Sequence, residues 1–226
     1  MILSPVRFRD RRDAGRRLAA ALARYRDLRP VVLALPRGGV PVGFEVARAL
    51  AAPLDVLLVR KIGAPGYPEL GLGAVIDGAD PHVVLNDAVM REVMPAPGYV
   101  EAETERQLAE IERRRRLYRG DRPAPSVAGH VVILVDDGIA TGGTVTAALR
   151  GLAAAQPARL VLAVPVAPPE ALETLSGLAD DVVCLSAPSL FGAVGRFYQD
   201  FEQTTDEEVI GLLAEAAVPP APSTAG

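Results

Sequence analysis

The sequence predicts an α/β fold, an open and mostly parallel twisted sheet flanked by helices, with a small carboxyl-terminal lobe and a helical insertion. Two observations support this prediction. First, the stretches 31–50 and 131–152 share one plan: a short aliphatic run meets a glycine-containing loop, and a segment with helical spacing follows. Second, further aliphatic runs leave room for helices between them, which is typical of parallel strands joined by right-handed crossovers.

The amino-terminal half is expected to supply one capped helix and the first strands. Asp10 can accept hydrogen bonds from the free N–H groups of a first helical turn, and Ala14, Leu18 and Leu22 then recur at helical spacing. The aliphatic run 31–35 predicts a strand, and the loop after it leads into a second helix. Three more strands are expected at 54–62, 72–76 and 82–85, with a loop at 63–71.

The carboxyl-terminal half repeats the alternation. The aliphatic residues from Val131 to Val135 predict a strand that is covered on both faces, and helical spacing begins at Thr144. A strand at 160–166, a helix after Pro169 and a strand at 182–185 complete the series. We expect residues 1–215 to form a single domain, and the Pro/Ala/Ser-rich tail 216–226 to be disordered.

A charged insertion at about 88–125 interrupts the alternation. Its segment 99–119 has the pattern of a helix, in which Glu110 faces Arg114 and Glu112 faces Arg116 at i,i+4. The run from Arg113 to Arg116 is best interpreted as part of a solvated, ion-paired helix. The alternative is an arginine cluster that reaches an anionic substrate.

The small carboxyl-terminal lobe, about residues 186–215, gathers Phe191, Phe197, Tyr198 and Phe201. Their spacing predicts Phe197 and Phe201 on one helical face, with Tyr198 beside Phe201. Packing of the lobe core is the favoured explanation of this cluster. The alternative is a flat surface on which a planar ligand stacks.

Composition excludes several classes of protein. A net charge of −4 disfavours a general nucleic-acid binder. The single cysteine, Cys184, lies in an apolar run, so we expect a buried strand thiol and a reducing, cytoplasmic location. No apolar run approaches the length of about 18 residues that a membrane span needs. His82 and His130 lie in no zinc-binding pattern, which disfavours a transition-metal site.

Two adjacent acids, Asp136 and Asp137, follow the strand at 131–135 and precede the loop "GIATGGT". Alone they would be explained by a turn or a helix cap. Together with the glycine-rich loop, they place acceptors for hydroxyl groups next to a set of N–H donors, which suits a sugar that bears a phosphate. The loop lacks the lysine of a P-loop and the GxGxxG pattern of a dinucleotide site.

The stretch "VVILVDDGIATGGT" resembles the motif with which type I phosphoribosyltransferases bind phosphoribosyl pyrophosphate (PRPP). "ALPRGGVPVG", after the first strand, is similar to the pyrophosphate loop of that family, in which a non-proline cis peptide is often found. The resemblance covers roughly 31–200 and is greatest to a bacterial branch of stand-alone members. It implies the type I phosphoribosyltransferase fold, with a hood lobe at the carboxyl end.

The resemblance also implies roles for individual residues. Asp136 and Asp137 would hold the ribose hydroxyls, and Arg37 would count with them as a catalytic residue. The 5′-phosphate would be bound by the loop residues Gly138, Ile139, Ala140, Thr141, Gly142, Gly143 and Thr144. Pyrophosphate would be bound by Arg37, Gly38, Gly39, Arg60 and Lys61, although a solvated strand end explains the last two equally well. Either the 63–73 loop or the 90–122 insertion would act as a lid.

The implied activity is transfer of the phosphoribosyl group from PRPP to a nitrogen of a base, with release of pyrophosphate, as in nucleotide salvage. Mg²⁺ would be held by PRPP, with Asp136 and Asp137 as candidate ligands. We expect a purine-type base that stacks on Phe197, Tyr198 or Phe201. A homodimer is a further expectation, and no nucleic-acid partner is expected. The alternative function is a non-catalytic sensor of PRPP or nucleotides with the same fold.

Overall fold

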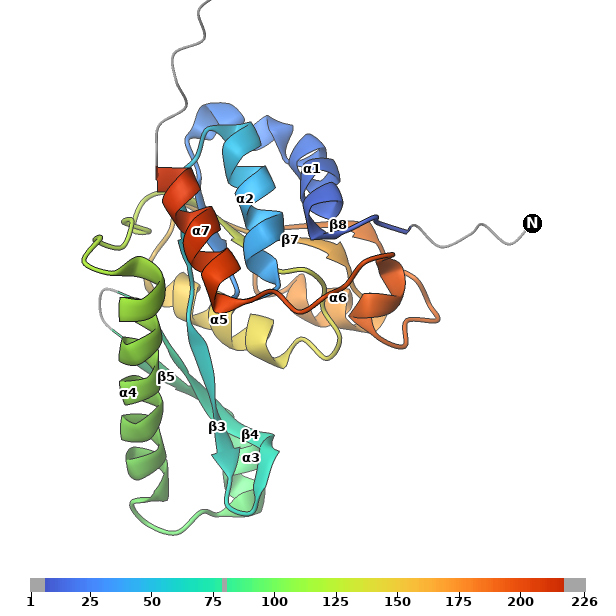
Figure 1. Ribbon diagram of the computed structural model, residues 1–226. Coiled ribbons are helices and arrows are strands. Elements are labelled where there is room, and N and C mark those ends of the chain that lie inside the picture. The colour runs from blue at the N-terminus through green and yellow to red at the C-terminus, as the bar shows by residue number, and fades with distance from the viewer. Residues whose placement is uncertain (1–6, 79–80, 218–226) are drawn as a thin grey trace, which may run out of the picture.

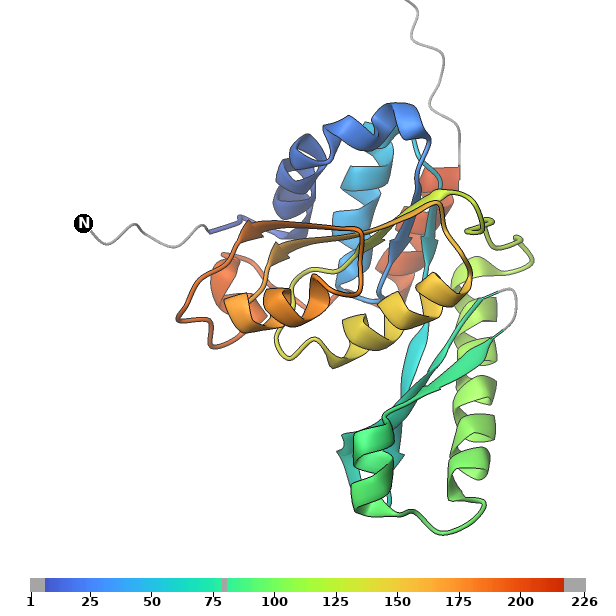
Figure 2. The same ribbon diagram turned by 180° about the vertical axis from the view of Figure 1, so that it is seen from behind.

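The computed structural model describes residues 7–78 and 81–217 and has a parallel sheet with helices on both faces (Figures 1 and 2). The five strands lie in the order β2-β1-β6-β7-β8, and every neighbouring pair is parallel. Their bounds are β1 Val31–Ala34, β2 Leu54–Val56, β6 Val131–Val135, β7 Arg159–Val166 and β8 Asp181–Ser186. The predicted mostly parallel α/β sheet is therefore confirmed.

Helices cover the two faces of this sheet because its strands are apolar on both sides. On β6, Ile133 faces the cluster that contains α1 and α2, whereas Leu134 faces the cluster that contains α5 and α6. Both side chains are fully buried. The helices are α1 Arg11–Ala21, α2 Gly39–Leu50, α5 Gly143–Ala154 and α6 Pro169–Leu175, with the short 3₁₀ helix η1 Ala23–Leu28 after α1. Asp10 caps α1, as predicted, by accepting a hydrogen bond from the Asp13 N–H.

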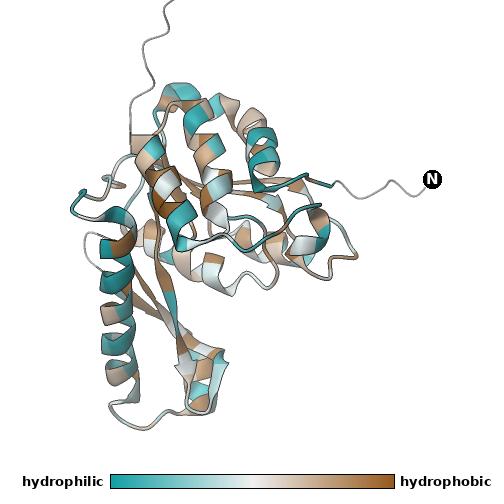
Figure 3. Ribbon diagram, viewed as in Figure 1, coloured by the Kyte–Doolittle hydropathy of each residue, from teal (hydrophilic) through white to brown (hydrophobic). Residues whose placement is uncertain are grey.

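A second, antiparallel sheet projects from the body of the molecule and carries the insertion (Figure 1). It consists of β3 Val59–Ala64, β4 Tyr67–Ile76 and β5 His82–Leu85, followed by α3 Asp87–Val93 and α4 Tyr99–Arg119. The helix predicted at 99–119 is confirmed with the same bounds. Most of α4 is hydrophilic (Figure 3), and the predicted pairs Glu110–Arg114 and Glu112–Arg116 are present at 2.7 and 2.9 Å.

The prediction of one strand at 54–62 is wrong. The chain leaves the parallel sheet after Val56, and β3 begins at Val59 in the antiparallel sheet. Leu57 and Leu58 are both buried at this break, but they belong to different apolar clusters. Leu57 lies in the cluster that contains residues of α5, and Leu58 lies in the cluster that contains residues of the carboxyl-terminal helix. The expected loop at 63–71 is also wrong, because β3 and β4 form a hairpin whose strands occupy most of it.

Buried ion pairs tie the end of α4 to the edge of the parallel sheet. The Arg119 Nε lies 2.8 Å from a carboxylate oxygen of Asp55 in β2, and its Nη2 lies 3.4 Å from Asp77. Arg115 also reaches Asp77, at 3.2 Å. Burial raises the pKa of Asp55, and the charge of Arg119 opposes that shift. Each arginine of the run from Arg113 to Arg116 is ion-paired, and Arg115 helps Arg119 to anchor the insertion.

The carboxyl-terminal segment divides into two parts. The 3₁₀ helix η2 Val194–Phe197 and the residues around it form the small lobe, whereas α7 Asp206–Ala217 packs with Phe44 of α2 and Val56 of β2. Residues 216 and 217 of the predicted disordered tail end α7, and the rest of that tail lies outside the described residues. In the described part of the chain, no helix combines the length and apolar character needed to cross a membrane.

Candidate active site

Two loops meet at the carboxyl edge of the parallel sheet. Because β1 and β6 are adjacent and in register from Val31 to Ala34, the loop after β1 and the loop after β6 leave the sheet side by side. A Cβ atom on Gly38 would lie 2.1 Å from an Asp137 carboxylate oxygen, so this contact requires glycine. A Cβ atom on Gly39 would lie 2.9 Å from the Val135 carbonyl oxygen at the end of β6. The Pro36–Arg37 peptide is cis, as the family resemblance led us to expect.

The two carboxylates lie at the meeting point of these loops. The Asp137 N–H donates to the Asp136 carboxylate over 2.9 Å. Burial, together with the neighbouring charge of Asp137, raises the pKa of Asp136 well above its usual value. Burial also raises the pKa of Asp137, although the guanidinium of Arg11 opposes the shift. Arg11 makes an ion pair with Asp137 over 2.7 Å.

The loop after the carboxylates ends at the start of α5. Ile139 anchors the loop, because its side chain is buried and its N–H donates to the Val166 carbonyl of β7. Gly142 has a φ of 77°, a conformation that favours glycine, and precedes the first residue of the helix. The N–H groups of the first helical turn have no partner within the helix and attract anions. Ala140 and Thr141 are exposed beside them.

Arg37 leaves the opposite loop and is half-exposed. Its Nη1 lies 3.9 Å from a carboxylate oxygen of Asp206, at the start of α7. The hydroxyl of Tyr118 donates to the same carboxylate. Of the residues assigned to pyrophosphate, Arg37, Gly38 and Gly39 therefore lie together at the carboxyl edge of the sheet.

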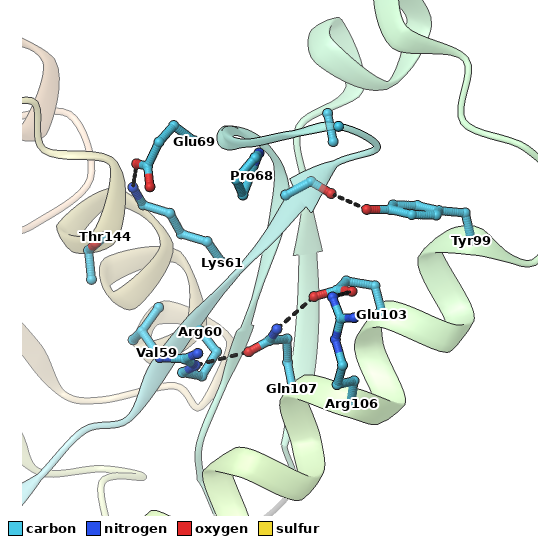
Figure 4. Close-up of a pocket in the computed structure, with 13 residues that line it drawn as sticks. Val59, Arg60, Lys61, Pro68, Glu69, Tyr99, Glu103, Arg106, Gln107 and Thr144 are labelled. Atoms are coloured by element: carbon cyan, nitrogen blue, oxygen red, sulfur yellow. Dashed lines mark hydrogen bonds and ion pairs between the residues drawn. The ribbon is translucent and has the colours of Figure 1, made fainter.

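Arg60 and Lys61 lie within β3, not beyond a strand end, and have different surroundings (Figure 4). The Arg60 Nε donates to Gln107 of α4 over 2.9 Å, and Lys61 pairs with the exposed Glu69 over 3.4 Å. A cavity of about 580 Å³ lies between the antiparallel sheet and α4, and both side chains line it together with Thr144. A second cavity, of about 440 Å³, lies between the antiparallel sheet and α5. Lys61 and Thr144 line this one too, whereas Arg60 does not.

The aromatic side chains of the carboxyl-terminal lobe have unequal exposure. Phe197 and Tyr198 are only 4% and 2% exposed, so lobe packing, the favoured explanation, is confirmed for both. Phe201 is 37% exposed, and the guanidinium of Arg11 lies 3.9 Å from the centre of its ring. The predicted shared helical face is wrong: η2 ends at Phe197, and Tyr198 is extended because it pairs with Phe8 of the amino-terminal segment.

Sequence reasoning missed two contacts to Asp137. Arg11 was one of several arginines near the amino terminus with no motif around it. The sequence marks Tyr198 only as a member of an aromatic cluster, yet its hydroxyl donates to the Asp137 carbonyl over 2.5 Å. Both residues lie far from Asp137 in the sequence, so local spacing carries no signal for either contact.

Comparison with known proteins gives consistent results. A family model described as "Phosphoribosyl transferase domain" matches residues 9–202. Two Mycobacterium tuberculosis proteins, each named "Putative phosphoribosyl transferase", are 48% identical over 209 residues, which is 92% of this chain and 47% of each relative. The chain thus spans about half the length of those relatives. The crystal structure of TT1426 from Thermus thermophilus is 50% identical, with a TM-score of 0.81, over 94% of this chain and 100% of that chain.

Proposed function

This chain belongs to the phosphoribosyl transferase domain family, and on that premise we propose that it transfers the 5-phosphoribosyl group of PRPP to a nitrogen atom of a base. The observation that carries the proposal is the contact between the two loops. Gly38 lies against Asp137, and α5 begins a few residues beyond. A ligand with a diol between a pyrophosphate and a 5′-phosphate matches that order of groups.

The proposed roles follow from this order. Asp136 and Asp137 accept hydrogen bonds from the ribose hydroxyls through their carboxyl oxygens. The loop from Gly138 to Thr144 and the start of α5 bind the 5′-phosphate through N–H groups. Arg37 and the backbone of Gly38 and Gly39 bind pyrophosphate, to which a guanidinium presents a two-pronged donor.

In the proposed reaction, a nitrogen of the acceptor forms a bond to C1′ while the bond from C1′ to the pyrophosphate oxygen breaks. Pyrophosphate leaves with the electron pair, and the proton of the nitrogen passes to solvent. The chain mainly orients the two reactants and stabilises the charge on the leaving group. We assign the stabilisation of that charge to Arg37. Lys61, which lines both cavities beside Thr144, is proposed as a second cation for the phosphates.

Mg²⁺ is part of the proposal. Among the described residues, no cluster of three or more acidic, histidine or cysteine side chains offers a dedicated cage. The pair Asp136 and Asp137 nevertheless fits this ion, which takes one or two carboxylates and completes its shell with phosphate oxygens and water. These two residues would hold it together with PRPP. When bound, Mg²⁺ neutralises charge on the pyrophosphate leaving group.

The acceptor is proposed to be a planar, purine-type base. Of the three aromatic candidates, Phe201 is the one whose ring is substantially exposed, whereas Phe197 and Tyr198 would have to leave the lobe core. A cytoplasmic location, a role in nucleotide salvage and a homodimer belong to the same proposal, and the family resemblance is what supports them.

Pyrophosphate release from Mg–PRPP, measured across a panel of bases and amines, tests the proposal, with calorimetry of Mg–PRPP binding alongside. We expect tight binding, turnover with one class of base, and loss of both in the double variant Asp136→Asn, Asp137→Asn with its fold intact. Absence of PRPP binding would refute the proposal. Binding without turnover on any acceptor would favour the sensing alternative.

A further inference from the structure

Arg11, in the first turn of α1, makes a buried contact with the proposed ribose-binding carboxylate. Its Nε lies 2.7 Å from the Asp137 Oδ2, and the two side chains are only 12% and 14% exposed. The position of a Cβ on Gly38 would be 3.3 Å from the same Nε. Arg11 therefore lies where the carboxylate and the pyrophosphate loop meet.

The Arg11 side chain is held in place by groups other than Asp137. Its Nη1 donates to the Glu202 carbonyl over 2.6 Å, and its guanidinium stacks on Phe201. The ring of Phe201 in turn packs on Tyr198, with ring centres 5.0 Å apart. An arginine fixed from two further directions cannot follow a rotating carboxylate, so it sets the orientation of the carboxylate.

The same part of the molecule also fixes the backbone of Asp137. The Tyr198 hydroxyl donates to the Asp137 carbonyl over 2.5 Å. Tyr198 is positioned by pairing of the amino-terminal segment with the carboxyl-terminal lobe: the Phe8 N–H donates to the Phe197 carbonyl, and the Gln199 N–H donates to the Phe8 carbonyl, both over 2.8 Å. The side chain of Asp137 is thus held from α1, and its backbone from the carboxyl-terminal lobe.

We propose that Arg11 is a positioning residue for PRPP: it holds one oxygen of Asp137, leaves the other facing the ribose hydroxyls, and balances the charge of two adjacent carboxylates. This inference rests on the proposed function. Arg11 acts through Asp137, so its loss should weaken ligands that contain the ribose diol and spare pyrophosphate alone. Because diol contacts exist both before and during the reaction, the loss should appear in KM for PRPP more than in kcat.

The test compares Arg11→Met, Arg11→Lys and a matched control, Arg12→Met. Arg12 lies on the same helix and pairs with a buried carboxylate, that of Glu45 in α2, over 2.7 Å, but Glu45 keeps Arg16 and Arg48 as partners and has no assigned role in ligand binding. Binding of Mg–PRPP and of Mg–pyrophosphate is measured by calorimetry, with melting temperature for each variant. KM and kcat are determined with the acceptor base that supports turnover.

We expect Arg11→Met to weaken Mg–PRPP binding about tenfold or more, by analogy with other residues that orient ligand-binding groups. Arg11→Lys should recover part of this loss, because it retains the charge. Arg12→Met should bind Mg–PRPP within about twofold of the wild type, and pyrophosphate affinity should be unchanged in all three.

Unchanged PRPP affinity in Arg11→Met, while the wild type binds, would overturn the role of Arg11 and leave the proposed function standing. Equal weakening in Arg12→Met, or parallel loss of pyrophosphate binding, would also overturn it, since either result indicates a general effect on the fold. If Arg11→Met does not fold, Arg11→Lys decides: wild-type affinity in that variant overturns the inference. Failure of the wild type to bind PRPP overturns the proposed function and this inference together.

Discussion

The contact between Gly38 and Asp137 makes Gly38→Ala the sharpest perturbation of the site. The added Cβ would lie 2.1 Å from the Asp137 Oδ2 and 2.7 Å from its Cγ. Ordinary contact begins at 3.4 Å, so either the carboxylate or one of the loops must move by about 1.3 Å. The Asp137 carboxylate cannot yield freely, because Arg11 holds the same oxygen over 2.7 Å. Such overpacking costs about 1–3 kcal/mol.

Thermal unfolding measures the loss of stability in Gly38→Ala, and calorimetry measures its loss of Mg–PRPP binding. For a chain of this size, each kcal/mol lowers the melting temperature by about 2–4 °C. Mg–PRPP binding should fall by more than the loss of stability alone explains, because a displacement of about 1 Å at a site of this kind costs about 100-fold. Gly211→Ala in α7 is the control: nothing lies within 4 Å of its added Cβ, so we expect a gain of about 0.5–1 kcal/mol and unchanged binding.

A double variant tests the cause. Combining Gly38→Ala with Asp137→Gly removes the carboxylate that causes the clash. Gly38→Ala should therefore cost less stability in the Asp137→Gly variant than in the wild type. PRPP binding should remain lost. Wild-type stability and wild-type affinity in Gly38→Ala would refute the reasoning, because the two loops would then have to lie further apart than the structure places them.

Three further predictions concern the surroundings of the site. Burial is the larger cause, and the hydrogen bond to the Asp206 carboxylate the next, of the rise in the pKa of Tyr118 from 10.0 to about 12. The protonated Tyr118 hydroxyl therefore stabilises the fold fully below pH 10, and this stabilisation is lost as the pH rises towards 12. In urea unfolding, the difference in stability between Tyr118→Phe and the wild type should shrink over that range. Arg119→Met leaves Asp55 buried without its 2.8 Å partner and should cost about 3–5 kcal/mol in urea unfolding, whereas a loss below about 1 kcal/mol would show the pair to be dispensable. Lys61→Ala breaks an exposed ion pair and should leave stability within about 1 kcal/mol of the wild type. It should nevertheless raise KM for PRPP, because Lys61 lines both cavities beside Thr144. An unchanged KM would show that Lys61 does not contact PRPP.

The parallel sheet and the loops at its carboxyl edge could be predicted from local patterns in the sequence. Aliphatic runs such as 131–135 can be buried on both faces only between two layers of helices, so their order along the chain predicts the layering. The loops at 35–38 and 136–142 are local features, and each lies directly after its strand. The helix at 99–119 could also be predicted from the sequence, because ion pairs at i,i+4 depend on local spacing alone.

Long-range packing sets where the chain passes from one apolar layer to another and which distant side chains meet. Leu57 and Leu58 read as part of one continuous strand, but they are buried in different clusters because the chain passes there from the parallel sheet into the antiparallel one. Arg11 reaches Asp137 from 126 residues away in the sequence. The pairing of the amino-terminal segment with the carboxyl-terminal lobe, at Phe8 and Phe197, accompanies that contact, and no local spacing encodes such a long-range arrangement.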